Sequence, residues 1–396
     1  MTTLRGLTLE EIPAYNRLSS ACFTYPVKSE ALIPKDMPPE RLREYRGVFD
    51  GEGRLLGAMI QLSMDARFEG HTCKLLGIGG VATDPAHRRH GAIRQLFEEG
   101  LPRLHDEGFV FSALYPFSHV FYRKFGYELG ILRRNAEVKT SAIRRDLRPA
   151  ASIRLILPDE PDGGMSDVYA KYIADKNLAV CRREDHWKAL REGTPWENLK
   201  YRYMLYDEAQ HPVGYWIGTA SRKDDCALMT IRDMAYTSCA GLEAIFAMLR
   251  TMNEIETISL TVPQDAELRF LVTDPYEVKE TVTCGGMVRV MNAERALGML
   301  PAPPVPGQAV IEVHDGQIPQ NCGCFTVTCD GIRITVTRGG EPDLRCGIGG
   351  LSALVTGMQD FEGGEASGFA EVLHPDKRPF LAMLFRQRKA HLHNYF

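Results

Sequence analysis

One segment of the chain carries the residue types and the spacing needed to bind a diphosphate. It runs from Gly77 to Arg94 and reads Gly-Ile-Gly-Gly-Val-Ala-Thr-Asp-Pro-Ala-His-Arg-Arg-His-Gly-Ala-Ile-Arg. The apolar run ends at Val81, a turn follows, and the residues after Gly91 have helical periodicity. The first N–H groups of a helix lack intrahelical partners and lie at the positive end of its dipole, so this junction favours an anion.

Arginines and glycines strengthen this interpretation. Gly91 lets a ligand approach the backbone closely, and the glycines before Val81 leave backbone groups free to pair with an extended ligand arm. The segment lacks the Gly-Lys-Ser/Thr of a P-loop and the Gly-x-Gly-x-x-Gly of a dinucleotide-binding loop. A basic helix start beside a surface loop is the alternative. The arginines are Arg88, Arg89 and Arg94.

The composition excludes several classes of protein. The 396 residues are 44% apolar and 25% charged, which is ordinary for a globular chain and rules out global disorder. With 47 basic and 51 acidic residues, the net charge of −4 gives no overall attraction for nucleic acid. The sequence shows neither a secretory signal nor the ~18 apolar residues of a membrane span, so we expect a cytoplasmic protein without membrane contact.

Ten cysteines are too few for a disulfide scaffold in a chain of this length, so we expect reduced thiols. Four of them lie close enough together to suggest zinc, namely Cys322, Cys324, Cys329 and Cys346. Zinc frameworks usually show two closely spaced ligand pairs, and the second pair is missing. Buried core thiols are the simpler interpretation, and we expect no metal.

The elements around the diphosphate segment recur once along the chain. Leu7–Phe23 predicts an amphipathic helix, Tyr45–Val81 an antiparallel meander, and the following residues a helix and then a strand at Phe109–Leu114. A similar order recurs over 165–262, which indicates duplication. The second copy has Ser-Cys-Ala-Gly at 238–241 in place of the charged turn, so we interpret it as structural.

A proline-rich run at 301–306 precedes a third pattern of alternating strands, in which Gly368–Leu373 is a helix candidate. A chain of this length is expected to form two or three domains. We place three, over 1–148, 149–292 and 293–396.

These features resemble a known superfamily and a family within it. The Arg-x-x-Gly turn resembles the pyrophosphate loop of the GNAT superfamily of acetyl-CoA-dependent N-acetyltransferases. The tandem units, a third unit similar to sterol carrier proteins, the segment Phe125-Gly126-Tyr127 and the final phenylalanine resemble the Eis (enhanced intracellular survival) family over essentially the whole chain. The resemblance implies an α+β fold: tandem GNAT domains, each a mixed, largely antiparallel sheet flanked by helices, and a C-terminal sterol-carrier-protein-like α/β domain.

By this resemblance, 1–148 is a catalytic GNAT domain, 149–292 a degenerate one, and 293–396 the sterol-carrier-like domain whose C-terminus reaches the active site. Acetyl-CoA is the implied co-substrate, and the amine of a small molecule or of a lysine side chain is the acceptor. The family also implies a homo-oligomer, often a hexamer. The implied cofactor-binding residues are Val81, Ala82, Thr83, Arg88, Arg89, His90, Gly91, Ala92, Ile93, Arg94, Phe117 and Ser118.

The resemblance also assigns the catalytic groups. Tyr122 matches the general acid of the family, and the C-terminal carboxylate, here that of Phe396, matches its base. A phenol with a pKa of about 10 can share its proton with a departing thiolate whose thiol has a pKa of about 8.5. A free α-carboxylate is a weak base unless it is desolvated, so it acts mainly by orienting the amine or a water. From the residues alone, Tyr122 as a packing aromatic and a frayed terminus stay open as alternatives.

The acceptor side departs from the family pattern. Relatives that accept polycationic drugs tend to carry a carboxylate near Phe23, where this chain has Tyr25, and the residue before the C-terminus is Tyr395. We expect these three aromatic residues to contact the acceptor, with cation–π contacts in place of carboxylates. The expected acceptor is therefore smaller or more compatible with aromatic rings than an aminoglycoside.

The sequence thus predicts direct, metal-free acetyl transfer to an amine. The alternative function is a non-catalytic protein that binds a hydrophobic ligand in the sterol-carrier-like domain. The intact Arg-x-x-Gly turn argues against it, because a scaffold has no need of that turn.

Overall fold

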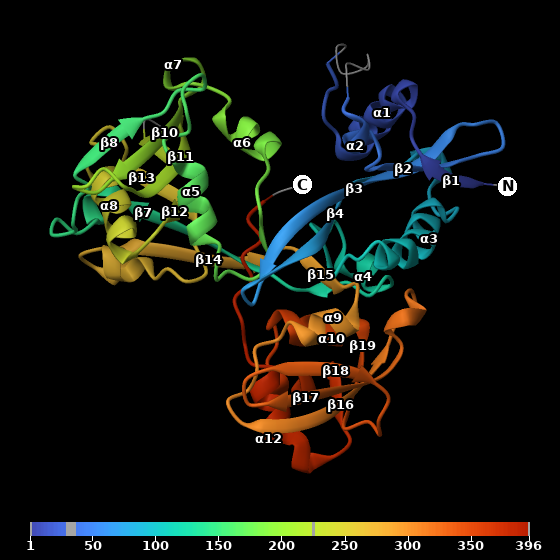
Figure 1. The fold of residues 1–396 in the computed structure, drawn as a ribbon. Helices are drawn as coiled ribbons and strands as arrows, with labels where there is room; N and C mark the ends of the chain where they lie inside the picture. The colour runs from blue at the N-terminus through green and yellow to red at the C-terminus, as the bar shows by residue number, and fades with distance from the viewer. Residues whose placement is uncertain (1, 29–36, 224–225, 395–396) are drawn as a thin grey trace. The chain divides into compact units, whose positions relative to one another are not determined.

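The computed structural model describes residues 2–28, 37–223 and 226–394, and it divides into two compact units (Figure 1). The first unit is discontinuous and contains the residues up to Ile131 together with those from Gly285 onward. The second unit is Leu132–Cys284. The diphosphate segment and the predicted catalytic tyrosine both lie in the first unit.

The first unit contains a mixed sheet with the strand order β1-β2-β3-β4-β5-β15-β6. The neighbours β4 and β5 are parallel, and every other adjacent pair in this order is antiparallel. The predicted meander is confirmed in β2, β3 and β4. The strands are β1 (Thr3–Gly6), β2 (Tyr45–Phe49), β3 (Leu55–Phe68), β4 (His71–Thr83), β5 (Phe111–Leu114), β6 (Glu128–Leu129) and β15 (Met287–Val290).

Two helices cover opposite faces of this sheet. Along β3, Ala58 packs in one cluster with residues of α1 (Ile12–Phe23), whereas Met59 packs in another with α3 (Ala92–Asp106). Successive side chains of a strand point to opposite faces, so the two helices lie on different sides. The helical periodicity predicted after Gly91 is confirmed in α3, whose apolar residues at three- and four-residue steps are all buried: Ile93, Leu96, Phe97, Leu101 and Leu104. Two short helices, α2 (Pro39–Leu42) and α4 (His119–Arg123), complete this part.

Strand β15 shows how the chain returns to its first sheet. The chain leaves this sheet after β6, forms the second unit, and comes back as β15, where Val288 pairs with both Ala113 of β5 and Glu128 of β6. Contacts between elements place 132–148 in the second unit and 285–292 in the first. The reason is long-range strand pairing, which leaves no local sequence signal.

The second unit has its own mixed sheet, with the strand order β14-β7-β13-β12-β11-β10-β8. Its parallel pair is β12–β13, and α8 precedes β13 as α3 precedes β5. Its strands are β7 (Leu132–Lys139), β8 (Ser152–Leu155), β10 (Lys200–Tyr206), β11 (Pro212–Lys223), β12 (Cys226–Tyr236), β13 (Thr257–Thr261) and β14 (Val278–Cys284). Its helices are α5 (Met165–Tyr172), α6 (Glu184–Arg191), α7 (Pro195–Asn198) and α8 (Cys239–Arg250).

The remainder of the first unit contains a third sheet, with the order β18-β17-β16-β19-β20. Its strands are β16 (Pro306–His314), β17 (Gly323–Asp330), β18 (Ile334–Arg338), β19 (Leu344–Gly347) and β20 (Ala370–Val372). The helix predicted at Gly368–Leu373 is wrong, because Ala370–Val372 pairs with β19 instead. The helices are α9 (Ala293–Gly298), α10 (Ile348–Thr356), α11 (Phe361–Ala366) and α12 (Arg378–Leu384).

Over the described ranges, no helix is both long and apolar enough to cross a membrane. The ten cysteines are free, with Cys329 and Cys346 buried. No group of three or more His, Cys, Asp or Glu side chains in the described part of the chain is arranged to hold a metal ion.

Candidate acetyl-CoA site

A β-bulge interrupts β4 just before the diphosphate segment. Ala58 pairs with Ala82 and Ile60 with Gly79, so β4 has two residues where β3 has one. Gly80, inside the bulge, has a φ of 54°, and a Cβ there would lie 1.9 Å from the Tyr15 hydroxyl oxygen. Such a bulge bends its strand and re-aims the residues that follow.

Beyond the bulge, β4 runs on without β5 beside it. The parallel pairing of the two strands ends at Ile78 and Leu114, where β5 also ends, whereas β4 continues to Thr83. Among the described residues, no strand pairs with 79–83 on that side. The backbone groups there are therefore placed to pair with the amides of an extended ligand.

The turn from β4 to α3 exposes backbone N–H groups. Asp84 caps a 3-10 turn over Pro85–His87, and the Ala86 N–H donates to the Asp84 carboxylate at 2.9 Å, which lowers the pKa of that carboxyl. Arg89 and Gly91 then adopt left-handed conformations, with φ of 69° and 88°. Left-handed residues beside ordinary ones form backbone concavities that bind anions. The N-cap residue of α3 is Gly91, which has no side chain to accept a hydrogen bond from the first turn. The N–H groups of that turn are therefore available to a ligand.

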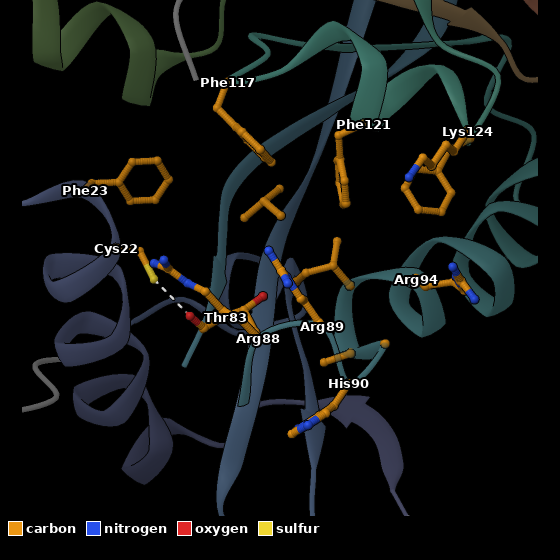
Figure 2. A pocket seen from close by; sticks show the side chains of 15 residues that line it. Cys22, Phe23, Thr83, Arg88, Arg89, His90, Arg94, Phe117, Phe121 and Lys124 are labelled. Carbon is orange, nitrogen blue, oxygen red and sulfur yellow. Dashed lines mark hydrogen bonds between the residues drawn. The ribbon is translucent and has the colours of Figure 1, made fainter. Parts of the chain in front are cut away.

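A cavity of about 930 Å³ opens at this turn (Figure 2). Phe23 of α1 lies on one side of it, and Phe117 and Phe121 lie on the α4 side. No aspartate or glutamate occurs among the described residues that line it. These are Cys22, Phe23, Val81, Thr83, Arg88, Arg89, His90, Gly91, Ala92, Ile93, Arg94, Phe117, Phe121, Lys124 and Phe125.

The cavity brings together most of the residues that the sequence nominated. Four described residues named from the sequence do not line it. Ala82 and Tyr122 are buried, Ser118 caps α4 by accepting from the Phe121 N–H, and the Tyr25 hydroxyl donates to Ser19 at 2.9 Å. Tyr395 and Phe396 lie outside the described residues.

Sequence reasoning missed four residues that line the cavity. Cys22 comes from the end of α1, and its thiol donates to the Thr83 carbonyl at 3.2 Å. The others lie on and just after α4, where Phe121, Lys124 and Phe125 recur at helical spacing. These three residues lie on either side of Tyr122 in the sequence, at spacings that place them on one face of a helix. This helical spacing could have predicted them as lining residues.

Tyr122 lies in α4 and is 3% exposed. Its ring makes edge contacts with Phe97, Phe117 and Phe121, at centroid distances of 6.0, 5.4 and 5.1 Å. Burial raises the pKa of the Tyr122 phenol well above its usual value, so the proton stays on the oxygen at neutral pH. Within the described ranges, no side chain or backbone group forms a hydrogen bond with this hydroxyl.

The end of the described chain is tied to the end of β5. The Tyr115 hydroxyl donates to the Asn394 carbonyl at 2.8 Å and contacts the Leu392 carbonyl at 3.4 Å. Earlier in the tail, Arg388 forms an ion pair of 2.8 Å with Glu69 in the β3–β4 turn. The last described residues therefore lie beside the strand that leads into Phe117.

Three family models match the chain. An acetyltransferase (GNAT) domain matches residues 3–130, a second acetyltransferase (GNAT) domain matches 178–290, and a sterol carrier protein domain matches 293–392. No curated protein matches the sequence.

Solved structures share the fold over the full length. They include a GCN5-related N-acetyltransferase from Anabaena variabilis (TM-score 0.89), a probable N-acyltransferase from Enterococcus faecalis (0.87) and an Eis protein from Mycobacterium abscessus (0.83). Each is 20% identical to this chain, and each alignment covers 100% of both chains. The predicted α+β architecture of two GNAT domains and a sterol carrier protein domain is thus confirmed. The chain contains two acetyltransferase (GNAT) domains and a sterol carrier protein domain in an Eis-like architecture, which indicates an N-acetyltransferase.

Proposed function

We propose that the protein transfers an acetyl group from acetyl-CoA directly to an amine in the cavity of the first unit. One observation carries the proposal: the uncapped N-terminus of α3 and two arginines face a single cavity. The N–H groups of the first turn and the positive end of the helix dipole suit a pyrophosphate. Arg88 and Arg89 add the charge that neutralises it.

The pantetheine arm fits the stretch of β4 that lacks a strand neighbour. Its amides extend the sheet by pairing with the backbone around Val81 and Thr83, as an added strand does. The thioester then lies past the bulge, near the ring contacts between Tyr122 and Phe117. Lys124 supplies a further positive charge to the same cavity.

Tyr122 acts as the general acid in this proposal. The amine nitrogen attacks the thioester carbonyl carbon, the carbon–sulfur bond breaks, and the phenol proton moves to the departing sulfur. The amine proton leaves on the opposite side, and the phenolate regains a proton from solvent. The buried, protonated hydroxyl and the resemblance of its segment to the Eis pattern support this role.

The C-terminal carboxylate of Phe396 acts as the base or orients the amine. Asn394 is held at the end of β5 by Tyr115. Only Tyr395 lies between Asn394 and Phe396 in the sequence, so the anchoring of Asn394 supports this assignment. An apolar surrounding raises its basicity by desolvation.

The acceptor in this proposal is a singly charged amine with an apolar or aromatic body. Phe23 and Phe117 are 51% and 70% exposed beside the cavity, so both rings are open to stacking. No carboxylate among the described lining residues is present to neutralise a polycation. An ammonium group over an aromatic face gains roughly 0.5–2 kcal/mol, which suits a monoamine.

Acetyl-CoA binding tests the proposal. At 100 times its dissociation constant, acetyl-CoA should stabilise the protein by about 2.7 kcal/mol, measured as a rise in melting temperature. The variant Arg88→Gln/Arg89→Gln should lose most of this rise, whereas Arg54→Gln, whose exposed side chain lies outside the cavity lining, should keep it.

The same preparations are then assayed for thiol release with phenethylamine, spermidine, an aminoglycoside and a lysine peptide. We expect phenethylamine to be preferred; a preference for the polycations would refute the acceptor class. If acetyl-CoA gives no stabilisation and a fatty acid does, the protein is instead a carrier of hydrophobic ligands.

A further inference from the structure

A fully buried ion pair lies behind the segment that carries Tyr122. Arg289 of β15 and Asp315, which follows β16, are both 0% exposed at their side chains. One guanidinium nitrogen of Arg289 donates to both carboxylate oxygens, at 2.6 and 2.8 Å. If one partner of such a pair is removed, the other is left as a buried, unpaired charge, which is strongly destabilising. The pair is therefore a costly feature, and its contacts indicate what it supports.

Both members of the pair are fixed by other contacts. The Asp315 carboxylate also accepts from the Gln317 and Ile318 N–H groups and from the Asn321 side chain, at 2.9, 3.1 and 2.9 Å. Arg289 is carried by a strand that pairs with β5 and β6. The guanidinium is therefore held in one place by the first sheet and by the loop after β16.

The free end of this guanidinium supports the turn after α4. The second amino group of Arg289 donates to the Phe125 carbonyl at 2.5 Å. Gly126, the next residue, has a φ of 78°, and a Cβ there would lie 1.8 Å from that amino group. Only glycine lets the backbone rest directly on the guanidinium, which gives a physical reason for the glycine of the Phe-Gly-Tyr segment.

The same turn forms backbone hydrogen bonds with Tyr122. The Tyr122 carbonyl accepts from the Phe125 N–H at 2.9 Å and from the Tyr127 N–H at 3.3 Å. Helix α4 has only five residues, too few to be stable without anchoring. The ion pair, the turn and the backbone of the tyrosine thus form one continuous set of contacts.

We propose that Arg289, held by Asp315, is a positioning residue for Tyr122. The inference rests on the proposed role of Tyr122 as the general acid. Through Asp315, the sterol carrier protein domain then supports the catalytic segment. A displacement of about 1 Å at a reacting group can lower a rate ~100-fold, so a support of this kind controls turnover.

The test compares Arg289→Met with a matched variant in the second unit. There, Arg182 forms a buried bidentate pair with Asp233, at 2.7 and 2.8 Å, and neither residue lines the cavity. Arg289→Met and Arg182→Met should both lower the melting temperature. Only Arg289→Met should lower kcat, by at least ~10-fold at saturating acetyl-CoA and amine, well below the melting temperature.

A double-mutant cycle separates positioning from general destabilisation. In a Tyr122→Phe background, Arg289→Met should lower kcat by no more than ~2-fold, because two residues that act through one group are not additive. If Arg289→Met does not fold, Gly126→Ala replaces it, since this change displaces the turn and leaves both charges in place.

An unchanged kcat in the folded variant overturns the inference, and so does an equal loss in Arg182→Met. A full additional loss in the Tyr122→Phe background also contradicts it. If Tyr122→Phe alone leaves kcat unchanged, the proposed general acid fails instead, and that outcome is visible in the single variant.

Discussion

Tyr122 is the residue on which the proposed chemistry depends. Burial raises the pKa of its phenol, which makes it a weaker acid than a tyrosine in water. Burial raises the pKa of a thiol as well, because desolvation disfavours any anion. In the proposed step the proton moves from the phenol to the departing sulfur, and the negative charge moves from the sulfur to the phenol oxygen. The raised pKa keeps Tyr122 protonated until the thiolate forms.

We expect Tyr122→Phe and deletion of Phe396 each to lower kcat by at least ~100-fold in a thiol-release assay, the scale of lost acid–base catalysis. Acetyl-CoA affinity should stay nearly unchanged in Tyr122→Phe, because only a hydroxyl is removed. The acid must be protonated, so activity falls as pH rises through its pKa. Since that pKa is raised, the wild-type protein should show no alkaline loss assignable to Tyr122 below a pH of about 10.

Tyr127→Phe is the matched control for this assay. Tyr127 is also a buried tyrosine of the same segment, with a pKa raised to about 12, but its hydroxyl is bonded to Ser112 at 2.6 Å. This variant should keep kcat within a few-fold of wild type. Equal losses in Tyr122→Phe and Tyr127→Phe would show that packing, and not proton donation, sets the rate.

The sequence identified the residues of the cavity that follow one another along the chain. The turn from Arg88 to Arg94 is recognisable because its glycine and its arginines are close together in the sequence and line the same cavity. Cys22 was missed, because it reaches the site only through the packing of α1 on β4. Tyr15 was missed for the same reason: its contact with Gly80 spans the β4 bulge, which sequence spacing does not show.

At the scale of elements, the bulge in β4 links the sheet to the cofactor site. Tyr15 of α1 packs over Gly80 and donates to its carbonyl at 3.3 Å, so the helix and the bulge support each other. The residues that follow the bulge are those expected to pair with pantetheine. A change that flattens the bulge should therefore act on binding as well as on stability.

Gly80→Ala should lower stability by roughly 2–6 kcal/mol, the sum of backbone strain and overpacking. It should also weaken acetyl-CoA binding, measured by calorimetry. Gly70→Ala, in the β3–β4 turn, is the control, because Gly70 has a φ of 79° and open space around its Cβ position. It should cost about 1–3 kcal/mol from strain alone and leave affinity unchanged. Equal affinity loss in both variants would exclude a role for the bulge.

Elements with a strong local pattern were predictable, and elements defined by distant partners were not. The helical periodicity of the sequence of α3 correctly predicted which of its apolar residues are buried. In contrast, Gly368–Leu373 has a short apolar pattern that suits either a helix or a strand. This segment forms strand β20 because it pairs with β19. Nothing local in Met287–Val290 shows that β15 completes a sheet begun more than 150 residues earlier.

At the scale of the molecule, the second unit is an insertion into the first. The two residues of the first unit that flank the insertion are joined by a hydrogen bond of 2.9 Å from the Gly285 N–H to the Ile131 carbonyl. The first sheet is complete only when β15 lies between β5 and β6, where Met287 and Val288 are fully buried. A fragment that ends after the first GNAT-like stretch lacks this strand and exposes the edge and the core beneath it.

This topology predicts which truncated protein folds. A chain in which 132–284 is replaced by a short Gly-Ser turn should fold cooperatively and bind acetyl-CoA, because Ile131 and Gly285 are already adjacent. Residues 1–148 alone should be largely unfolded and should not bind, since an unpaired strand edge and an open core are unfavourable. Circular dichroism and a thermal shift with acetyl-CoA check both chains. If residues 1–148 fold and bind as well as the deleted chain does, the strand from beyond the insertion is dispensable, and the acetyl-CoA site is built from local structure alone.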